Sequence, residues 1–283
     1  MPQVWPGQAR CVVNITVDFD GPSLEVGDEV GAHGKHSSGH YSPKRGVPRI
    51  LEILKRHDIR ATFFVPGYDC ELYPEAVQTI AASGHEIGAH GYLHETYDLG
   101  EQEPALLRKS HDILTRLLGK APRGWRNPGG GKSDLTIRVL RELGYIYDSS
   151  EKMSDWPYFP VIDGKLITDF INLPDNVSSL DDYPFYWLNR TPPSEVLEQW
   201  KAEFQAIYAE GGYFDIIFHS RNMWGSGTPA RAKVLDDLVS FMKSYPGVRF
   251  ETQEETARWC FQNPSAWPMR RNPRQDQRQD QRG

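Results

Sequence analysis

The chain has 283 residues, with 32 Lys and Arg against 38 Asp and Glu, and a formal net charge of −6 at pH 7. This mildly acidic balance gives no reason to expect binding to nucleic acid or to an anionic membrane, and no apolar stretch approaches the length needed to span a bilayer. The length allows one large α/β domain or two small ones.

Three widely separated cysteines, Cys11, Cys70 and Cys260, are the only thiols in the chain. An odd number without C-x-x-C spacing argues against a disulfide framework or a zinc ribbon. The first ten residues also lack the apolar region of a signal peptide. The sequence therefore predicts free thiols and a cytoplasmic location.

Apolar runs alternate with amphipathic helical patterns along the whole chain. Strands are predicted, in chain order, at residues 11–17, 61–65, 85–90, 123–126, 145–148, 169–173, 213–219 and 248–250. Helices are predicted between them: at 47–54, 74–83 and 104–118, from a cap at Ser133, from a cap at Ser194, from Thr228-Pro229, and from a capping box of Thr252 and Glu255.

This alternation predicts parallel strands joined by helical crossovers. About seven or eight such units are enough to close a (β/α) barrel. No internal repeat or linker divides the chain, so residues 1–265 are predicted to form one domain. The polar, repetitive segment 266–283 is predicted to be disordered.

Several of the predicted strands end in side chains that can do chemistry. In a barrel of this type the carboxyl ends of the strands share one rim, where active sites lie. The residues at these ends are Asp18, Asp20, His90, Arg126, Asp148 and His219. We therefore expect them to converge, although they span two hundred residues of sequence.

The segment AHGYLHE places His90 and His94 four residues apart, so one helical turn would bring both imidazoles to the same side. Two imidazoles and one carboxylate from the D-F-D rim suit a divalent metal and leave positions open for water and substrate. Because the chain has nine histidines, this spacing alone is a weak signal, and two histidines without a ligand role are the alternative.

The motifs TVDFDGPS, GHEIGAHGYLHE, RGWRNPGG, YDSS and IIFHS occur in this order. The chain thereby resembles the NodB-homology polysaccharide deacetylases (carbohydrate esterase family 4), over roughly residues 10–262. Segments such as GVPRILEILKRHDIRATFFVPG and LPDNVSSLDDYP resemble the branch that holds peptidoglycan deacetylases and allantoinase-like hydrolases. The resemblance implies a distorted (β/α) barrel.

The resemblance also implies roles for individual residues. Asp20, His90 and His94 match the metal triad, usually for Zn²⁺, with Co²⁺, Ni²⁺ or Mn²⁺ as other divalent candidates. Asp18 matches the general base and His219 the general acid. Arg126 matches the arginine that holds the base, and Asp148 matches the aspartate that steadies the acid.

The expected substrate contacts are Trp125, Pro128 and Gly129, beside Arg126. The sequence departs from the family pattern here, because the usual aromatic residue after Pro128 is missing. His33, His36 and His40 lie in a long polar first loop, and their role is left open between loop residues and extra ligands.

The resemblance implies a metal-dependent hydrolase of non-peptide C–N bonds that deacetylates an N-acetylated sugar, a peptidoglycan fragment or a related N-acyl substrate. An alternative is a cyclic amide or imide hydrolase. Some relatives in this branch work without metal, so this alternative includes a metal-independent enzyme. A catalytically silent carbohydrate-binding module is a third reading, which the intact Asp18, His90 and His219 disfavour. Relatives in this branch are often oligomeric, and the sequence leaves the number of subunits open.

Overall fold

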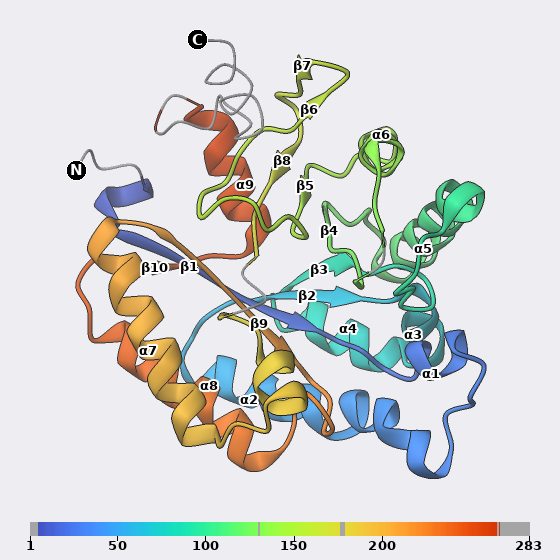
Figure 1. Cartoon of the computed structure of the whole chain (residues 1–283), viewed down its shortest axis with the longest axis horizontal. Helices are drawn as coiled ribbons and strands as arrows, with labels where there is room; N and C mark the ends of the chain where they lie inside the picture. The colour runs from blue at the N-terminus through green and yellow to red at the C-terminus, as the bar shows by residue number, and fades with distance from the viewer. Residues whose placement is uncertain (1–4, 130, 176–178, 265, 267–283) are drawn as a thin grey trace.

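A computed structural model describes residues 5–129, 131–175, 179–264 and 266. Eight strands form one curled, parallel sheet with helices packed on its outside (Figure 1). The strands of this sheet are β1 (Cys11–Asp18), β2 (Thr62–Val65), β3 (Glu86–Ala89), β4 (Gly124–Trp125), β5 (Tyr147–Asp148), β8 (Ile171–Asn172), β9 (Tyr213–His219) and β10 (Val248–Phe250). The prediction of a distorted (β/α) barrel is confirmed.

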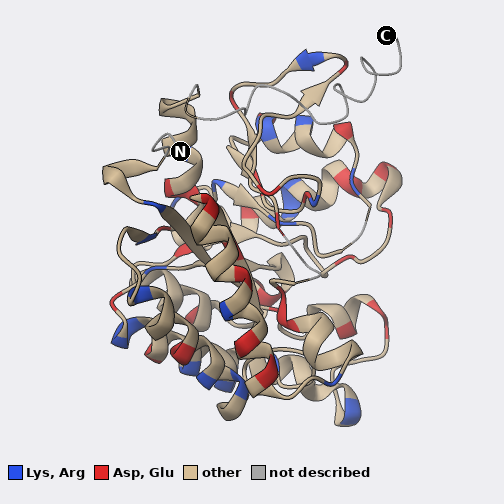
Figure 2. Cartoon of the chain, turned by 60° about the vertical axis from the view of Figure 1, so that its left-hand side comes forward, with Lys and Arg blue, Asp and Glu red and all other residues tan. Residues whose placement is uncertain are grey.

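The helices of the described residues are α1 (Ser23–Gly27), α2 (Val47–Arg56), α3 (Gly67–Leu72), α4 (Pro74–Ala82), α5 (Glu103–Leu118), α6 (Asp134–Glu142), α7 (Pro193–Glu210), α8 (Pro229–Lys243) and α9 (Gln253–Gln262). An antiparallel pair, β6 (Val161–Ile162) and β7 (Lys165–Leu166), stands apart from the main sheet. Acidic and basic residues are interspersed along the outer helices (Figure 2). No helix within the described ranges is both long and apolar enough to cross a membrane.

Strand β1 pairs with three other strands of the sheet. It pairs with β9 along seven residues, from Val12↔Tyr213 to Asp18↔His219. On its other edge, its first half pairs with β10 and its last residues pair with β2. All eight residues of β1 are buried, so both faces of this strand are covered.

Side chains of β1 alternate between two environments because successive residues of a strand point to opposite faces. Val13, Ile15 and Val17 belong to the large hydrophobic core, whereas the residues between them, Asn14 and Thr16, are buried and polar. The side of the sheet that carries these polar residues also carries Asp18. This interior side is apolar at Val12, which belongs to a second buried hydrophobic cluster, and polar from Asn14 to Asp18.

Most predicted element boundaries agree with the structure, including the cap at Ser133 and the capping box at Thr252. The predicted cap at Ser194 is wrong. Helix α7 begins at Pro193 after Pro192, because a proline at the first helical position needs no hydrogen bond for its nitrogen. The predicted long first loop contains α1 and short helical turns at Gly34–His40 and Ser42–Gly46. The predicted disordered tail, 266–283, lies outside the described residues except for Ala266.

Candidate active site

The D-F-D sequence places two carboxylates on the same side of the chain. Asp18 ends β1, and Asp20 follows after Phe19, whose side chain is fully buried in the large hydrophobic core. Alternation therefore turns Asp18 and Asp20 together toward the interior. The register pairs Asp18 with His219 on one neighbouring strand, which brings the two ends of β1 and β9 to one rim.

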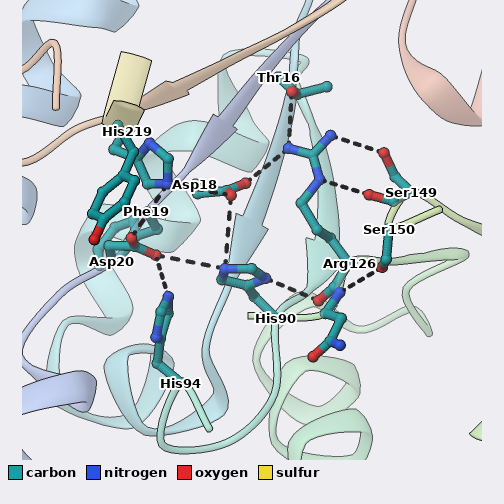
Figure 3. A network of polar contacts seen from close by, with 12 residues as sticks. Thr16, Asp18, Phe19, Asp20, His90, His94, Arg126, Ser149, Ser150 and His219 are labelled. Atoms are coloured by element: carbon teal, nitrogen blue, oxygen red, sulfur yellow. Dashed lines mark hydrogen bonds and ion pairs between the residues drawn. The ribbon is translucent and has the colours of Figure 1, made fainter. Parts of the chain in front are cut away.

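Asp20, His90 and His94 come together at this rim (Figure 3). Oδ1 of Asp20 lies 3.3 Å from Nε2 of His94 and 3.6 Å from Nε2 of His90. One ligand atom from each residue lies within 4.8 Å of the others. Burial alone would raise the pKa of Asp20, but the neighbouring imidazoles, His94 first, outweigh burial and hold that pKa below its usual range. The carboxylate is therefore charged.

These three residues fit a divalent metal. Nδ1 of His90 lies 2.9 Å from the carbonyl oxygen of Arg126. Because a carbonyl only accepts hydrogen bonds, Nδ1 must carry the proton, which leaves the lone pair on Nε2 facing Asp20. Oδ1 of Asp20 is buried and makes no hydrogen bond within the described residues. Two imidazoles and a carboxylate aimed at one point are the donor set of a catalytic zinc site.

The predicted helical turn between His90 and His94 is wrong. No residue from His90 to Leu99 is helical, and His94 has a left-handed backbone with φ of 57°. The carboxylate of Glu95 holds this loop, because it accepts hydrogen bonds from the backbone N–H groups of Tyr92 and Leu93. The two imidazoles still meet, with ring centroids 5.0 Å apart.

Arg126 spans the polar interior from the end of β4 to β1 and β9. Its guanidinium donates to Thr16 and Asp18, at 2.9 Å each, and to Asp215 at 3.1 Å. It also donates to the carbonyl and the hydroxyl oxygen of Ser149 (Figure 3). This fixes the orientation of the Asp18 carboxylate, whose other oxygen lies 3.7 Å from Nε2 of His90 and 3.7 Å from Nε2 of His219.

His219 is held by Asp182, a residue that the sequence reasoning missed. Oδ1 of Asp182 lies 2.6 Å from Nδ1 of His219, and its Oδ2 accepts from the backbone N–H of His219 at 3.0 Å. Burial alone would lower the pKa of His219, but the carboxylates of Asp182 and Asp181 outweigh burial and raise that pKa well above its usual value. The imidazolium form is therefore favoured.

The predicted contact between Asp148 and His219 is wrong. The Asp148 carboxylate is fully buried and pairs with Lys132, and it accepts a hydrogen bond from the hydroxyl of Ser150. Asp148 ends β5, whereas His219 ends β9, and β1 to β4 separate these strands in the sheet. Asp182 reaches His219 because the bridge between Asp181 and Ile217 places this segment beside β9.

A signal for Asp182 exists in the sequence. The segment Leu180-Asp181-Asp182 repeats, in short form, the pattern of an apolar residue followed by carboxylates that marks the end of β1. Without knowledge of the bridge to β9, however, nothing in that pattern distinguishes it from a surface turn.

The predicted substrate contacts differ in position. Trp125 is 4% exposed and belongs to the large hydrophobic core, because it precedes Arg126 on the strand and so points to the opposite face. This placement argues against a contact between Trp125 and substrate. Pro128 is buried beside Gly91 in the loop of the histidine pair, and Gly129 is exposed with φ of 104°.

The three histidines of the first loop stay apart from the metal-ligand cluster. No cluster of metal-ligating side chains in the described ranges includes His33, His36 or His40. The ring of His40 instead contacts the hydroxyl of Tyr73 through Nδ1 and the carbonyl of Ala32 through Nε2. These contacts are typical of a structural histidine.

Comparison with known proteins gives a consistent result. The family model for polysaccharide deacetylases matches residues 26–147, which include His90, His94 and Arg126. A peptidoglycan deacetylase from Helicobacter pylori is 29% identical over 257 residues, covering 78% of this chain and 85% of that protein.

Solved structures share the complete fold. A Mycobacterium smegmatis structure assigned to the polysaccharide deacetylases is 31% identical, with a TM-score of 0.81, and the match covers 91% of this chain and 92% of that one. The allantoinase Puue is 25% identical, with a TM-score of 0.80, and the match covers 94% of both chains.

Proposed function

We propose, from the premise that this chain belongs to the polysaccharide deacetylase family and is a hydrolase of non-peptide C–N bonds, that it removes an acetyl group from an N-acetylated sugar with a divalent metal in the site. The observation that carries the proposal is the convergence of Asp18, Asp20, His90, His94 and His219 at one rim.

Asp20, His90 and His94 would hold the metal, with Zn²⁺ the first candidate and Co²⁺, Ni²⁺ or Mn²⁺ the others. When bound, such a metal polarises the amide carbonyl and lowers the pKa of a water molecule. Asp18 is the general base, because Arg126 orients its carboxylate and its free oxygen faces the space between His90 and His219.

His219 is the general acid that protonates the leaving nitrogen. Its Nε2 lies 3.7 Å from Oδ2 of Asp18 and 3.8 Å from Oδ2 of Asp20, so the acid and the base border the same space. Asp182 takes the role first expected of Asp148, since it fixes the tautomer of His219 and favours the imidazolium.

A metal assay tests the proposed metal dependence. Purified enzyme should contain about one divalent metal per chain, should lose hydrolysis on treatment with a chelator, and should regain it with Zn²⁺. Hydrolysis that persists after the metal has been removed would contradict the proposal.

The second candidate is hydrolysis of a cyclic amide or imide, and the allantoinase match favours it. A panel of N-acetylated sugars, peptidoglycan fragments, cyclic ureides and imides separates the two, because the first reaction releases acetate and the second opens a ring without releasing a fragment. Ring opening alone, with no acetate from any N-acetyl substrate, would replace the first proposal by the second.

Cytoplasmic location and assembly into an oligomer stay predictions. The three cysteines are buried and unpaired, which agrees with a reducing compartment. Fractionation of the host cell and light scattering of the purified protein would test these two points.

A further inference from the structure

Two of the three proposed metal ligands have an unusual backbone. Asp20 has φ of 40° and His94 has φ of 57°, and neither is a glycine. A residue with a side chain in this left-handed region costs roughly 1 kcal/mol or more, so surrounding contacts must hold it there. Each of these two residues adjoins a turn that is closed by a buried carboxylate outside the metal site.

Asp69 closes the turn after Asp20. Its side chain is fully buried on α3, and Oδ2 accepts from the backbone N–H of Gly21 at 2.8 Å and from the hydroxyl of Ser23 at 2.7 Å. Oδ1 accepts from the backbone N–H of Ser23 at 3.0 Å. A Cβ at Gly21 would come within 2.5 Å of Oδ1, so only glycine permits this close approach.

Glu95 closes the loop that presents His94. Its side chain is buried, with 3% exposure, and its two oxygens accept from the backbone N–H groups of Tyr92 at 3.0 Å and Leu93 at 2.9 Å. Gly91, with φ of 70°, leaves room for this carboxylate, because a Cβ there would overlap Oε2. Both oxygens of Glu95 therefore accept hydrogen bonds from the backbone next to His94.

Helix α3 connects the two turns. The backbone N–H groups of Gly67 and Tyr68 donate to the carbonyl oxygens of Gly91 and Tyr92, at 3.0 and 2.9 Å. The helix that carries Asp69 is therefore bonded to the loop that Glu95 closes. The turn after Asp20 and the loop before His94 therefore bond to the same short helix.

We propose that Asp69 and Glu95 are positioning residues that preorganise Asp20 and His94 for metal binding. This inference rests on the proposed metal-dependent function. Contacts that orient metal ligands typically contribute roughly 10- to 100-fold to metal affinity. A carboxylate that accepts two or three N–H or O–H groups cannot be replaced by an amide without turning an NH₂ group toward one of those donors.

The test measures the Kd for Zn²⁺ of Asp69→Asn and Glu95→Gln by competition with a chromogenic chelator. The matched control is Glu251→Gln, since Glu251 is a buried carboxylate that follows β10, at the other end of β1. Asp69→Asn and Glu95→Gln should each weaken Zn²⁺ binding by roughly 10- to 100-fold, and saturating Zn²⁺ should restore most of their hydrolysis. The control should keep the wild-type Kd.

Spectra of the Co²⁺-loaded protein provide a second readout, because a displaced ligand changes the visible absorption bands of Co²⁺ while a loss of stability alone does not. If Asp69→Asn does not fold, Ser23→Ala removes a single hydrogen bond to Asp69 and should give a smaller loss of affinity.

The possible results separate two failures. Wild-type affinity in folded variants at both turns would overturn the positioning role and leave the metal site standing. A wild-type protein that binds none of Zn²⁺, Co²⁺, Ni²⁺ and Mn²⁺ would overturn the proposed function and this inference with it.

Discussion

The hydrogen bond between Asp182 and His219 gives the sharpest test of the proposed mechanism. Its O···N distance is 2.6 Å, and both groups are buried. Replacing Asp182 by asparagine removes the negative charge while keeping the size of the side chain. A hydrogen bond to a charged group contributes about 1.5–3 kcal/mol, and Asp181, 3.6 Å from Nδ1 of His219, retains part of the electrostatic support.

Because about 1.4 kcal/mol corresponds to a factor of ten, Asp182→Asn should lower kcat/KM by roughly 10- to 100-fold. The loss should fall on kcat, since in the proposed mechanism His219 donates its proton only as the bond to nitrogen breaks. Acetate release from the best substrate of the panel measures the effect, with metal content checked on the same sample.

Asp148→Asn is the matched control, because Asp148 is an equally buried aspartate that ends β5 and pairs with Lys132. It should change kcat much less than Asp182→Asn does. If Asp148→Asn proves the more damaging of the two in folded, metal-loaded protein, the assignment of Asp182 as the partner of His219 is refuted.

Three further predictions concern stability. Arg126→Met should lower the free energy of unfolding by about 3–5 kcal/mol in urea titrations, because it leaves buried carboxylates without their partner. Burial, and then the nearby Arg60, lower the pKa of His85 from 6.5 to about 4. The stability that comes from keeping His85 neutral is present above pH 6.5 and is lost as the pH falls through 4, about 3 kcal/mol in all. His85→Gln should therefore flatten the dependence of the free energy of unfolding on pH in this range. Gly46→Ala should lower Tm and activity together, because its Cβ would overlap the carbonyl oxygen of Ser220, whereas Gly131→Ala, whose Cβ would meet its nearest atoms at 3.6 Å, should lower neither as much.

Each of these has a clear contrary result. Unchanged urea midpoints for Arg126→Met would mean that the buried carboxylates find other partners. If the free energy of unfolding of His85→Gln depends on pH as that of the wild type does, His85 is not the cause of the loss of stability in acid. Equal losses in the two alanine variants would mean that the close approach at Gly46 is not what matters.

The sequence predicted those parts of the site that strand periodicity determines. Asp18, His90, Arg126 and His219 stand at or directly after strand ends, and parallel strands bring their carboxyl ends to one rim. The same alternation explains why Phe19 separates two interior carboxylates. Local pattern and tertiary position agree here, so the prediction needed no knowledge of long-range contacts.

The sequence could not predict features that depend on contacts between distant segments. The left-handed backbone of His94 depends on the carboxylate of Glu95 and on room at Gly91. The partner of His219 depends on a bridge between a loop and β9, which no periodic pattern in the sequence predicts. The burial of Trp125, by contrast, follows from strand alternation once Arg126 is placed in the interior, so the sequence pattern could have predicted it.

The pairing of β1 with β9 has a consequence for synthesis. Residues 11–18 leave the ribosome about two hundred residues before residues 213–219, yet the two strands pair along seven positions. Contacts so distant in sequence slow folding, and an unpaired β1 is an open strand edge that invites aggregation. A nascent chain that stalls before residue 213 exposes that edge, so about the final quarter of the polypeptide protects the first strand from self-association.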